Sequence, residues 1–296
     1  MPRNLALTAS AIALMLGFSS SPAVADDHEE TATGPALWQV SDDDTTIYLF
    51  GTIHVLPEGE TWYDERISTA FDASEELVFE IDMDDMAGAA QMMQGLAMLP
   101  EGQTLRSLMA EDDLAEYETA LESIGIPAAA LDPVEPWAAT LTLSMVPLVQ
   151  AGYQPDQGVE MVLRQRGEDK TRAALETMEE QVALFDTMPM DAQLELLDAT
   201  VENMDNVVSS IEAMKTEWLE GDADALGELM NDELDDPALY ETLLVNRNRN
   251  WVNWIENRMG EPGTVFIAVG AGHLAGEDSV QEILSERGFN AERVAR

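Results

Sequence analysis

The sequence predicts a single domain of α+β or α/β class, with a central mixed sheet built from both ends of the chain and a large helical insertion between them. Short β-type runs stand near the start, at 37–50 and 77–81, and near the end, at 263–269. Between 86 and 259, Met, Ala and Leu recur mainly at helical spacing. The runs "TTIYLFGTIH" and "GTVFIAVGAGH" are alike, and each ends in Gly-x-x-His.

The first 25 residues have the pattern of a secretory signal peptide. Arg3 gives a short basic start, residues 5–18 are apolar, and Ala23-Val24-Ala25 is an A-x-A cleavage pattern. An uncleaved membrane anchor is the alternative, but this stretch is short for a span of ~20 residues. We therefore expect cleavage after Ala25, a periplasmic or secreted protein, and no stable membrane insertion afterwards. A flexible leader is expected over 26–36 and the folded domain over 37–296.

The first predicted elements are a hairpin, a helix and a buried strand. The acidic triplet at 42–44 is a turn between β-type runs at 37–40 and 45–50. A helix is expected over 66–73. The compact apolar run "LVFEI" at 77–81 is typical of a buried strand.

A helical subdomain is expected over about 86–262. One run interrupts it, "KTRAAL" at 170–175, which predicts a short strand ending at Glu176. The last predicted elements are a buried strand, a helix and an edge strand, at 263–269, 279–287 and 290–294. No solenoid repeat is present.

The composition is strongly acidic. There are 58 acidic residues against 14 basic ones, a net charge of −44, and removing Arg3 with the signal peptide leaves the mature chain near −45. Such a surface repels nucleic acid, so no nucleic-acid partner is expected. A cationic partner would explain the charge, but the acids are spread along the chain, which favours a solvated surface suited to saline surroundings. The absence of Cys excludes thiol catalysis and Cys-ligated zinc.

Two of the three histidines, His54 and His273, close the two similar runs. A Gly at the end of a strand permits positive φ and close backbone approach. A His three residues later can then point over the strand ends, where open sheets usually bind ligands. If the two strands lie side by side, the histidines meet. Imidazole is the commonest metal ligand, so the sequence predicts that His54 and His273 bind a metal.

Three glutamates are candidates to complete this site. Glu80 ends a strongly apolar run, and burying a lone charge there would be costly without a nearby cation. Glu176 ends the run "KTRAALE" in the same way. Glu160 follows Gly158 near the start of a helix, where it could be a ligand, a general base or an acid favoured by the helix dipole.

The segment "VNRNRNW" contains the most prominent cation candidates, Arg247 and Arg249. Both could pair with surrounding acids on a helix surface. We favour a functional role for Arg247, holding a substrate carboxylate or stabilising a developing oxyanion. HExxH, G-x-S-x-G and Gly-rich phosphate-loop motifs do not occur.

Together these stretches resemble the TraB/GumN family, whose relatives include the Tiki metalloproteases. The matching stretches are "LWQVSDDDTTIYLFGTIHVLP", "LVFEID", "PW" at 136–137, "GVE" at 158–160, "KTRAALETMEEQ", "RNRNW" and "VGAGHLAGEDSV". The GumN-like bacterial branch is most similar, because it is exported and lacks a transmembrane tail. The resemblance implies a fold shared with erythromycin-esterase-like and ChaN-like proteins.

The resemblance also implies a divalent metal, Mn²⁺, Co²⁺ or Zn²⁺, and hydrolytic, peptide-cleaving activity. By position, the family's core metal site carries over as His54, Glu80 and His273. Its flanking motif residues carry over as Glu176, Arg247 and Asn248. Family members often have Asp where this chain has Glu160, so the resemblance assigns that residue no role.

The resulting expectation is an exported metal-dependent hydrolase, most simply a peptidase, acting on a peptide or small-molecule substrate. One of the three glutamates would complete the metal shell and another would take a proton from metal-bound water, whose pKa falls to ~7. Two alternatives stay open: a non-catalytic protein that sequesters a peptide, a metal or haem, and an ester hydrolase that works through His54 without metal. The oligomeric state is not predicted.

Overall fold

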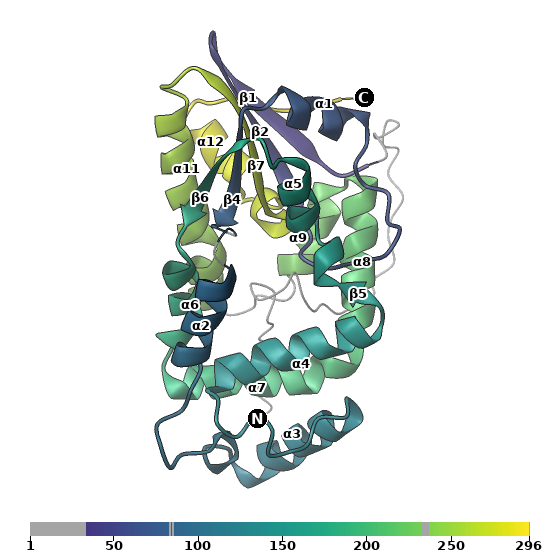
Figure 1. The fold of residues 1–296 in the computed structure, drawn as a ribbon, viewed down its shortest axis with the longest axis vertical. Coiled ribbons are helices and arrows are strands. Elements are labelled where there is room, and N and C mark those ends of the chain that lie inside the picture. The colour runs from purple at the N-terminus through teal and green to yellow at the C-terminus, as the bar shows by residue number, and fades with distance from the viewer. Residues whose placement is uncertain (1–33, 83, 85, 232–236, 296) are drawn as a thin grey trace.

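The structure is a computed structural model, and it describes residues 34–295 apart from 83, 85 and 232–236 (Figure 1). The predicted signal peptide and residues 26–33 of the predicted leader lie outside the described residues. Within the described ranges, no helix has the length and apolar character needed to cross a membrane.

Six strands form one mixed sheet in the order β6-β4-β7-β2-β1-β8. The strands, in chain order, are β1 (Leu37–Ser41), β2 (Thr45–Thr52), β4 (Glu76–Ile81), β6 (Thr171–Glu176), β7 (Gly263–Gly270) and β8 (Ala291–Arg293). Strands β6, β4, β7 and β2 are parallel, whereas β1 is antiparallel to both of its neighbours. The predicted mixed sheet built from both ends of the chain is therefore confirmed, with bounds that differ by one or two residues from those expected.

The last long strand, β7, lies in the middle of the sheet between β2 and β4. It pairs with β2 over the full length of both, from Thr45 opposite Gly263 to Thr52 opposite Gly270. Both strands are almost entirely buried, as parallel strands covered on two faces usually are. Alternate β7 side chains enter separate clusters: Phe266 and Ala268 pack on one face, Val265 and Ile267 on the other.

Helices cover both faces of this sheet (Figure 1). One face packs against α1 (Glu65–Ala73), α5 (Val159–Arg166), α8 (Val207–Glu220) and α9 (Ala223–Asn231). The other face packs against α11 (Asn246–Arg258) and α12 (Val280–Glu286). Indole and phenyl rings dominate the first face, where Phe50 stacks on Trp62 with ring centroids 5.7 Å apart.

The predicted insertion is mainly helical and extends beyond the sheet (Figure 1). Its outer part contains α2 (Met86–Leu96), α3 (Glu111–Ser123), α4 (Pro136–Gln150), α6 (Met178–Asp186) and α7 (Met190–Asn203). A short helix, α10 (Pro237–Tyr240), leads through a π-helical turn into α11. The insertion also supplies β6, which was predicted, and β5 (Tyr153–Gln154). Strand β5 pairs with β3 (Leu56–Pro57), which precedes the insertion, in a two-strand ribbon that the sequence did not predict.

Candidate active site

The carboxyl ends of the four parallel strands bring the predicted residues together. Strand β2 leads to His54, β7 leads to His273, β4 carries Glu80 as its penultimate residue, and β6 ends at Glu176. Because these strands are parallel neighbours, their carboxyl ends lie along one edge of the sheet. The two Gly-x-x-His strands lie side by side, which was the condition set for their histidines to meet.

Glycine is required here for close contacts rather than for a left-handed backbone. Neither Gly51 nor Gly270 has positive φ. A Cβ on Gly51 would lie 3.0 Å from the Cα of Ala271, so its absence lets the two His-bearing segments approach. A Cβ on Gly158 would overlap the carbonyl oxygen of His54. Gly158 therefore allows α5 to begin against the segment that follows β2.

Arg247, on α11, lies between two strand-end carboxylates. Its Nε donates to Glu176 Oε1 at 2.8 Å, and its Nη2 donates to Glu176 Oε2 at 2.9 Å and to Glu80 Oε2 at 2.6 Å. Its Nη1 donates to the carbonyl oxygen of Leu243 at 3.3 Å and contacts Nε2 of His273 at 3.0 Å. All five N–H groups of the guanidinium therefore have a partner within the protein.

His273 is held in one tautomer by its two neighbours. An arginine N–H can only donate, so Nε2 of His273 accepts from Arg247, and Nδ1 donates to Oδ1 of Asn248 at 2.6 Å. Asn248 in turn donates to the carbonyl oxygen of Asp278 at 2.7 Å. Burial, reinforced by the Arg247 charge, lowers the pKa of His273 to about 3, so the imidazole is neutral.

The carboxylate of Glu80 is ionised. Burial alone would raise the pKa of Glu80, but Arg247 and the backbone N–H of Gly270, 2.7 Å from Oε1, contribute to lowering it to about 2. Glu176 also accepts a hydrogen bond from Nε1 of Trp251 at 3.0 Å. The Trp251 ring also packs against the His273 ring, and the two ring centroids are 4.2 Å apart.

His54 forms a second, adjacent group with Glu160. Nδ1 of His54 lies 2.6 Å from Oε1 of Glu160, and the hydroxyl of Thr52 donates to the same oxygen. The Glu160 side chain is 11 % exposed, whereas the His54 side chain is 41 % exposed. The Glu160 charge raises the pKa of His54 to about 9 despite the opposing effect of burial. Burial acts to raise the pKa of Glu160, but His54 and Thr52 hold it below its usual range.

A cavity of about 370 Å³ opens beside His54. Three of the predicted residues line it, His54, Glu80 and Glu160, together with Gln181 from α6 and mostly apolar side chains. Glu176, Arg247, Asn248 and His273 do not line this cavity. The structure thus brings all seven predicted residues to one edge of the sheet but leaves only part of the set facing open space.

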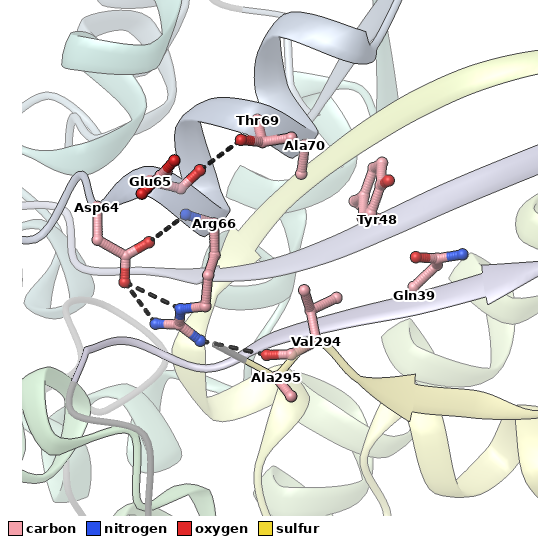
Figure 2. Close-up of a pocket in the computed structure, with 9 residues that line it drawn as sticks. All are labelled: Gln39, Tyr48, Asp64, Glu65, Arg66, Thr69, Ala70, Val294 and Ala295. Atoms are coloured by element: carbon pink, nitrogen blue, oxygen red, sulfur yellow. Dashed lines mark hydrogen bonds and ion pairs between the residues drawn. The ribbon is translucent and has the colours of Figure 1, made fainter.

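A second cavity, of about 560 Å³, lies between α1 and the C-terminal segment and contains none of the predicted site residues (Figure 2). Arg66 lines this cavity. It donates to Asp64 Oδ2 at 2.6 Å and to the carbonyl oxygens of Pro35 at 3.2 Å and Val294 at 3.3 Å. These contacts fasten the first and last described segments to α1, so we assign Arg66 a structural role.

Comparison with known proteins gives the family of this chain. The TraB/PrgY/gumN family model matches residues 36–293. The chain belongs to the TraB/PrgY/gumN family.

Two relatives are similar to this chain over most of its length. An uncharacterized protein of Treponema pallidum (strain Nichols) is 22% identical, over 85% of this chain and 80% of its own length. The uncharacterized protein YbaP of Escherichia coli (strain K12) is 23% identical, over 85% of this chain and 92% of its own length. No solved structure matches the chain significantly.

The metal site implied by the TraB/GumN resemblance does not fit this arrangement. Within the described ranges, no group of three or more His, Asp or Glu side chains is arranged to hold a metal ion. Both nitrogens of His273 are engaged by Arg247 and Asn248, and the guanidinium supplies the positive charge between Glu80 and Glu176. The Arg247 cation thus lies where the predicted ligands His273 and Glu80 would meet a metal. Metal binding by this protein stays a prediction.

Sequence reasoning missed three side chains of this family site. Gln181 donates to Glu80 at 2.9 Å, Thr52 donates to Glu160, and Trp251 donates to Glu176. All three lie inside the stretches that carry the family resemblance, so position within those stretches was the available signal. Arg247 was predicted to contact substrate, but its donors are all used within the protein.

Proposed function

We propose that this member of the TraB/PrgY/gumN family is a hydrolase in which His54, oriented by Glu160, acts as general base towards water. The observation that carries the proposal is the 2.6 Å contact between His54 Nδ1 and Glu160 Oε1 at the wall of a cavity. A carboxylate on Nδ1 fixes the imidazole tautomer and leaves Nε2 to accept a proton. A base held this way contributes typically 10²–10⁴-fold to a hydrolytic rate.

The proposed reaction uses the protein's own groups. Nε2 of neutral His54 takes a proton from water as the water oxygen adds to the substrate carbonyl carbon. The imidazolium then returns that proton to the departing alcohol or amine as the carbon–oxygen or carbon–nitrogen bond breaks. One water is consumed, an acid and an alcohol or amine are released, and neutral His54 is restored.

The buried network of Arg247, Glu80 and Glu176 supports this chemistry, and of these three side chains only Glu80 lines the cavity. Arg247 pairs with both Glu80 and Glu176. The Glu80 charge also favours the protonated form of His54, while the Arg247 charge opposes it. The charges of Glu80 and Arg247 therefore both contribute to the pKa of His54.

The proposal differs from the metal-dependent peptidase expected from the resemblance and from the binding-protein alternative. Each makes a separate prediction: turnover that needs a divalent metal, or ligand binding with no turnover. Export to the periplasm or medium, expected from the first 25 residues, is compatible with all three and stays a prediction.

The test is hydrolysis of p-nitrophenyl butyrate, an uncharged ester, by the purified protein after exhaustive chelation. Turnover should survive chelation, and His54→Ala and Glu160→Gln should each lower kcat/KM by about 10²-fold or more. Glu122→Gln, an exposed position on α3, is the matched control and should leave the rate unchanged. Activity that vanishes on chelation and returns with metal would favour the metal route. No turnover by the wild type under any condition would reject both hydrolase readings.

A further inference from the structure

We propose that the cavity beside His54 binds the apolar acyl group of an uncharged ester or amide, and that Gln181 holds the carbonyl oxygen of that substrate. This inference rests on the proposed hydrolytic function and names its substrate class. Three observations carry it: the apolar wall of the cavity, the absence of an unpaired cation for an anionic group, and the amide nitrogen of Gln181, which has one N–H without a partner among the described residues.

The wall of the cavity is apolar and comes from several elements. The side chains that define it are Phe79, Met93, Trp137, Met161, Met178 and Phe185. Three of these are methionines, whose flexible thioether chains adapt to ligands of different shape. A cavity of about 370 Å³ lies in the range of small-molecule sites, which are mostly apolar with a few placed polar groups. The occupant should therefore be a hydrocarbon-rich group.

The polar end of the cavity disfavours an anionic ligand. Among the residues that the structure describes, no Lys or Arg lines the cavity, whereas two acids, Glu80 and Glu160, do. The imidazole of His54 is already paired with Glu160. A substrate carboxylate would lose its water and meet two carboxylates with no cation of its own, which is costly. An uncharged carbonyl compound avoids that penalty.

Gln181 provides a donor for the carbonyl oxygen. Its Nε2 lies 2.9 Å from Oε2 of Glu80, and a carboxylate can only accept, so the amide nitrogen faces Glu80. One N–H of that nitrogen is used, and the second has no partner among the residues that the structure describes. Gln181 and His54 line the same cavity. A donor anchored in this way can bind a carbonyl oxygen and stabilise the negative charge that develops on it.

The first test is a series of p-nitrophenyl esters from acetate to octanoate, with the hemisuccinate as the anionic member. Each buried methylene should raise kcat/KM about fourfold until the cavity is full. The hemisuccinate should react more slowly than the butyrate. Met161→Trp and Met93→Trp should abolish the preference for long chains by filling the cavity. Met98→Trp is the matched control, because Met98 is 47% exposed and does not line the cavity, and it should behave as wild type.

The second test measures binding without turnover. Octanamide should bind wild type and His54→Ala by calorimetry, bind Met98→Trp equally, and bind Met161→Trp at least about tenfold more weakly. Binding that follows this pattern, with no ester hydrolysed, supports the assigned ligand class and rejects the hydrolase. Ester hydrolysis that ignores chain length and is unchanged in both cavity-filling variants rejects the ligand class and leaves the hydrolase standing.

The role of Gln181 has its own readout. Gln181→Leu should lower kcat for the butyrate ester by about tenfold or more, since removal of one oxyanion donor costs up to ~10³-fold elsewhere. Octanamide affinity should fall by a smaller factor, because the apolar contacts remain. A variant that loses thermal stability but keeps wild-type kcat would show that Gln181 only supports Glu80, and would overturn this part of the proposal.

Discussion

Nη2 of Arg247 lies 2.6 Å from Oε2 of Glu80, and both side chains are largely buried, with exposed fractions of 6% and 11%. The same guanidinium donates to Glu176 from Nε and from Nη2. One cation thus pairs with two strand-end carboxylates.

Removing this cation should be strongly destabilising. Arg247→Ala would leave Glu80 and Glu176 buried without their counter-charge, and breaking a buried pair in this way costs about 3–5 kcal/mol. Urea unfolding measures the loss. Arg249→Ala is the matched control on the same helix, because its pair with Glu241 is about half exposed, and it should cost under about 1 kcal/mol. Equal losses in the two variants would contradict the assigned role of Arg247.

The position of Arg247 also predicts how the wild type responds to divalent metals. Calorimetric titration with Mn²⁺, Co²⁺ or Zn²⁺ should show no saturable binding that depends on His273, because both of its ring nitrogens are occupied within the protein. The experiment compares wild type with His273→Ala and His54→Ala. Tight binding lost in both variants would instead establish the metal site implied by the TraB/GumN resemblance.

The proposed reaction should be faster at alkaline pH. His54 must be neutral to accept a proton, and its pKa is raised to about 9, first by Glu160 and then by Glu80, against burial and Arg247; its neighbour His273 is neutral. A plot of kcat/KM should therefore rise with pH and level off above about 9. Glu160→Gln removes the main charge that raises the pKa, so its weaker activity should level off at lower pH. An unchanged midpoint in that variant would contradict the pairing.

The same pair predicts a stability effect of defined sign. A folded-state pKa above the unfolded value of about 6.5 means that protonation of His54 stabilises the fold. That contribution should be complete below about pH 6.5 and lost as pH rises through about 9. Urea unfolding at both ends of this range, in wild type and His54→Ala, measures it. A difference between the two proteins that does not shrink over this range would argue against the ion pair.

Glycine at 158 should be irreplaceable because of space, not backbone angle. A Cβ there would overlap the carbonyl oxygen of His54, so Gly158→Ala should displace α5 from His54, lower the melting temperature and reduce ester hydrolysis. Gly95→Ala is the matched control, since a Cβ on that α2 residue meets nothing within 4 Å. It should be neutral or slightly stabilising, as Ala favours a helix by about 1 kcal/mol over Gly. Parity between the two variants would refute the close approach.

High salt should stabilise the protein. Acids outnumber bases 58 to 14, so repulsion within the compact state outweighs attraction. Salt screens it, with a Debye length of ~10 Å at 0.1 M and ~3 Å at 1 M. The melting temperature should rise with NaCl up to near-molar concentration, and His54→Ala should show the same rise. A flat or falling melting temperature would contradict the argument that repulsion between acidic side chains destabilises the folded state.

The strands and their ends could be predicted because apolar runs record burial directly. The likeness of the His54 and His273 strands suggested that they pair, and Glu80 and Glu176 followed from charges placed at the ends of apolar runs, but the order of the sheet was not predicted. Side-chain direction beyond a strand end leaves no such record. His54 turns towards Glu160 on α5, whereas His273 is buried beneath α11 against Arg247. Identical Gly-x-x-His spacing therefore gave two different environments.

The small elements were missed for a related reason. The β3–β5 ribbon has only two residues in each strand, too few to show alternation. Gln181 was overlooked because a helix of mixed composition gives no hint that one amide reaches a carboxylate on β4.

The central place of β7 has a consequence for the order of assembly. Its neighbours β2 and β4 are synthesised early, yet the strand that joins them comes from the last part of the chain. Until residues 263–270 have left the ribosome, two edges that belong at the centre of the sheet have no partner. Nascent or truncated chains should thus be unfinished and prone to wrong pairing. A molecule whose central strand is made last therefore stays open along the middle of its sheet for most of its synthesis.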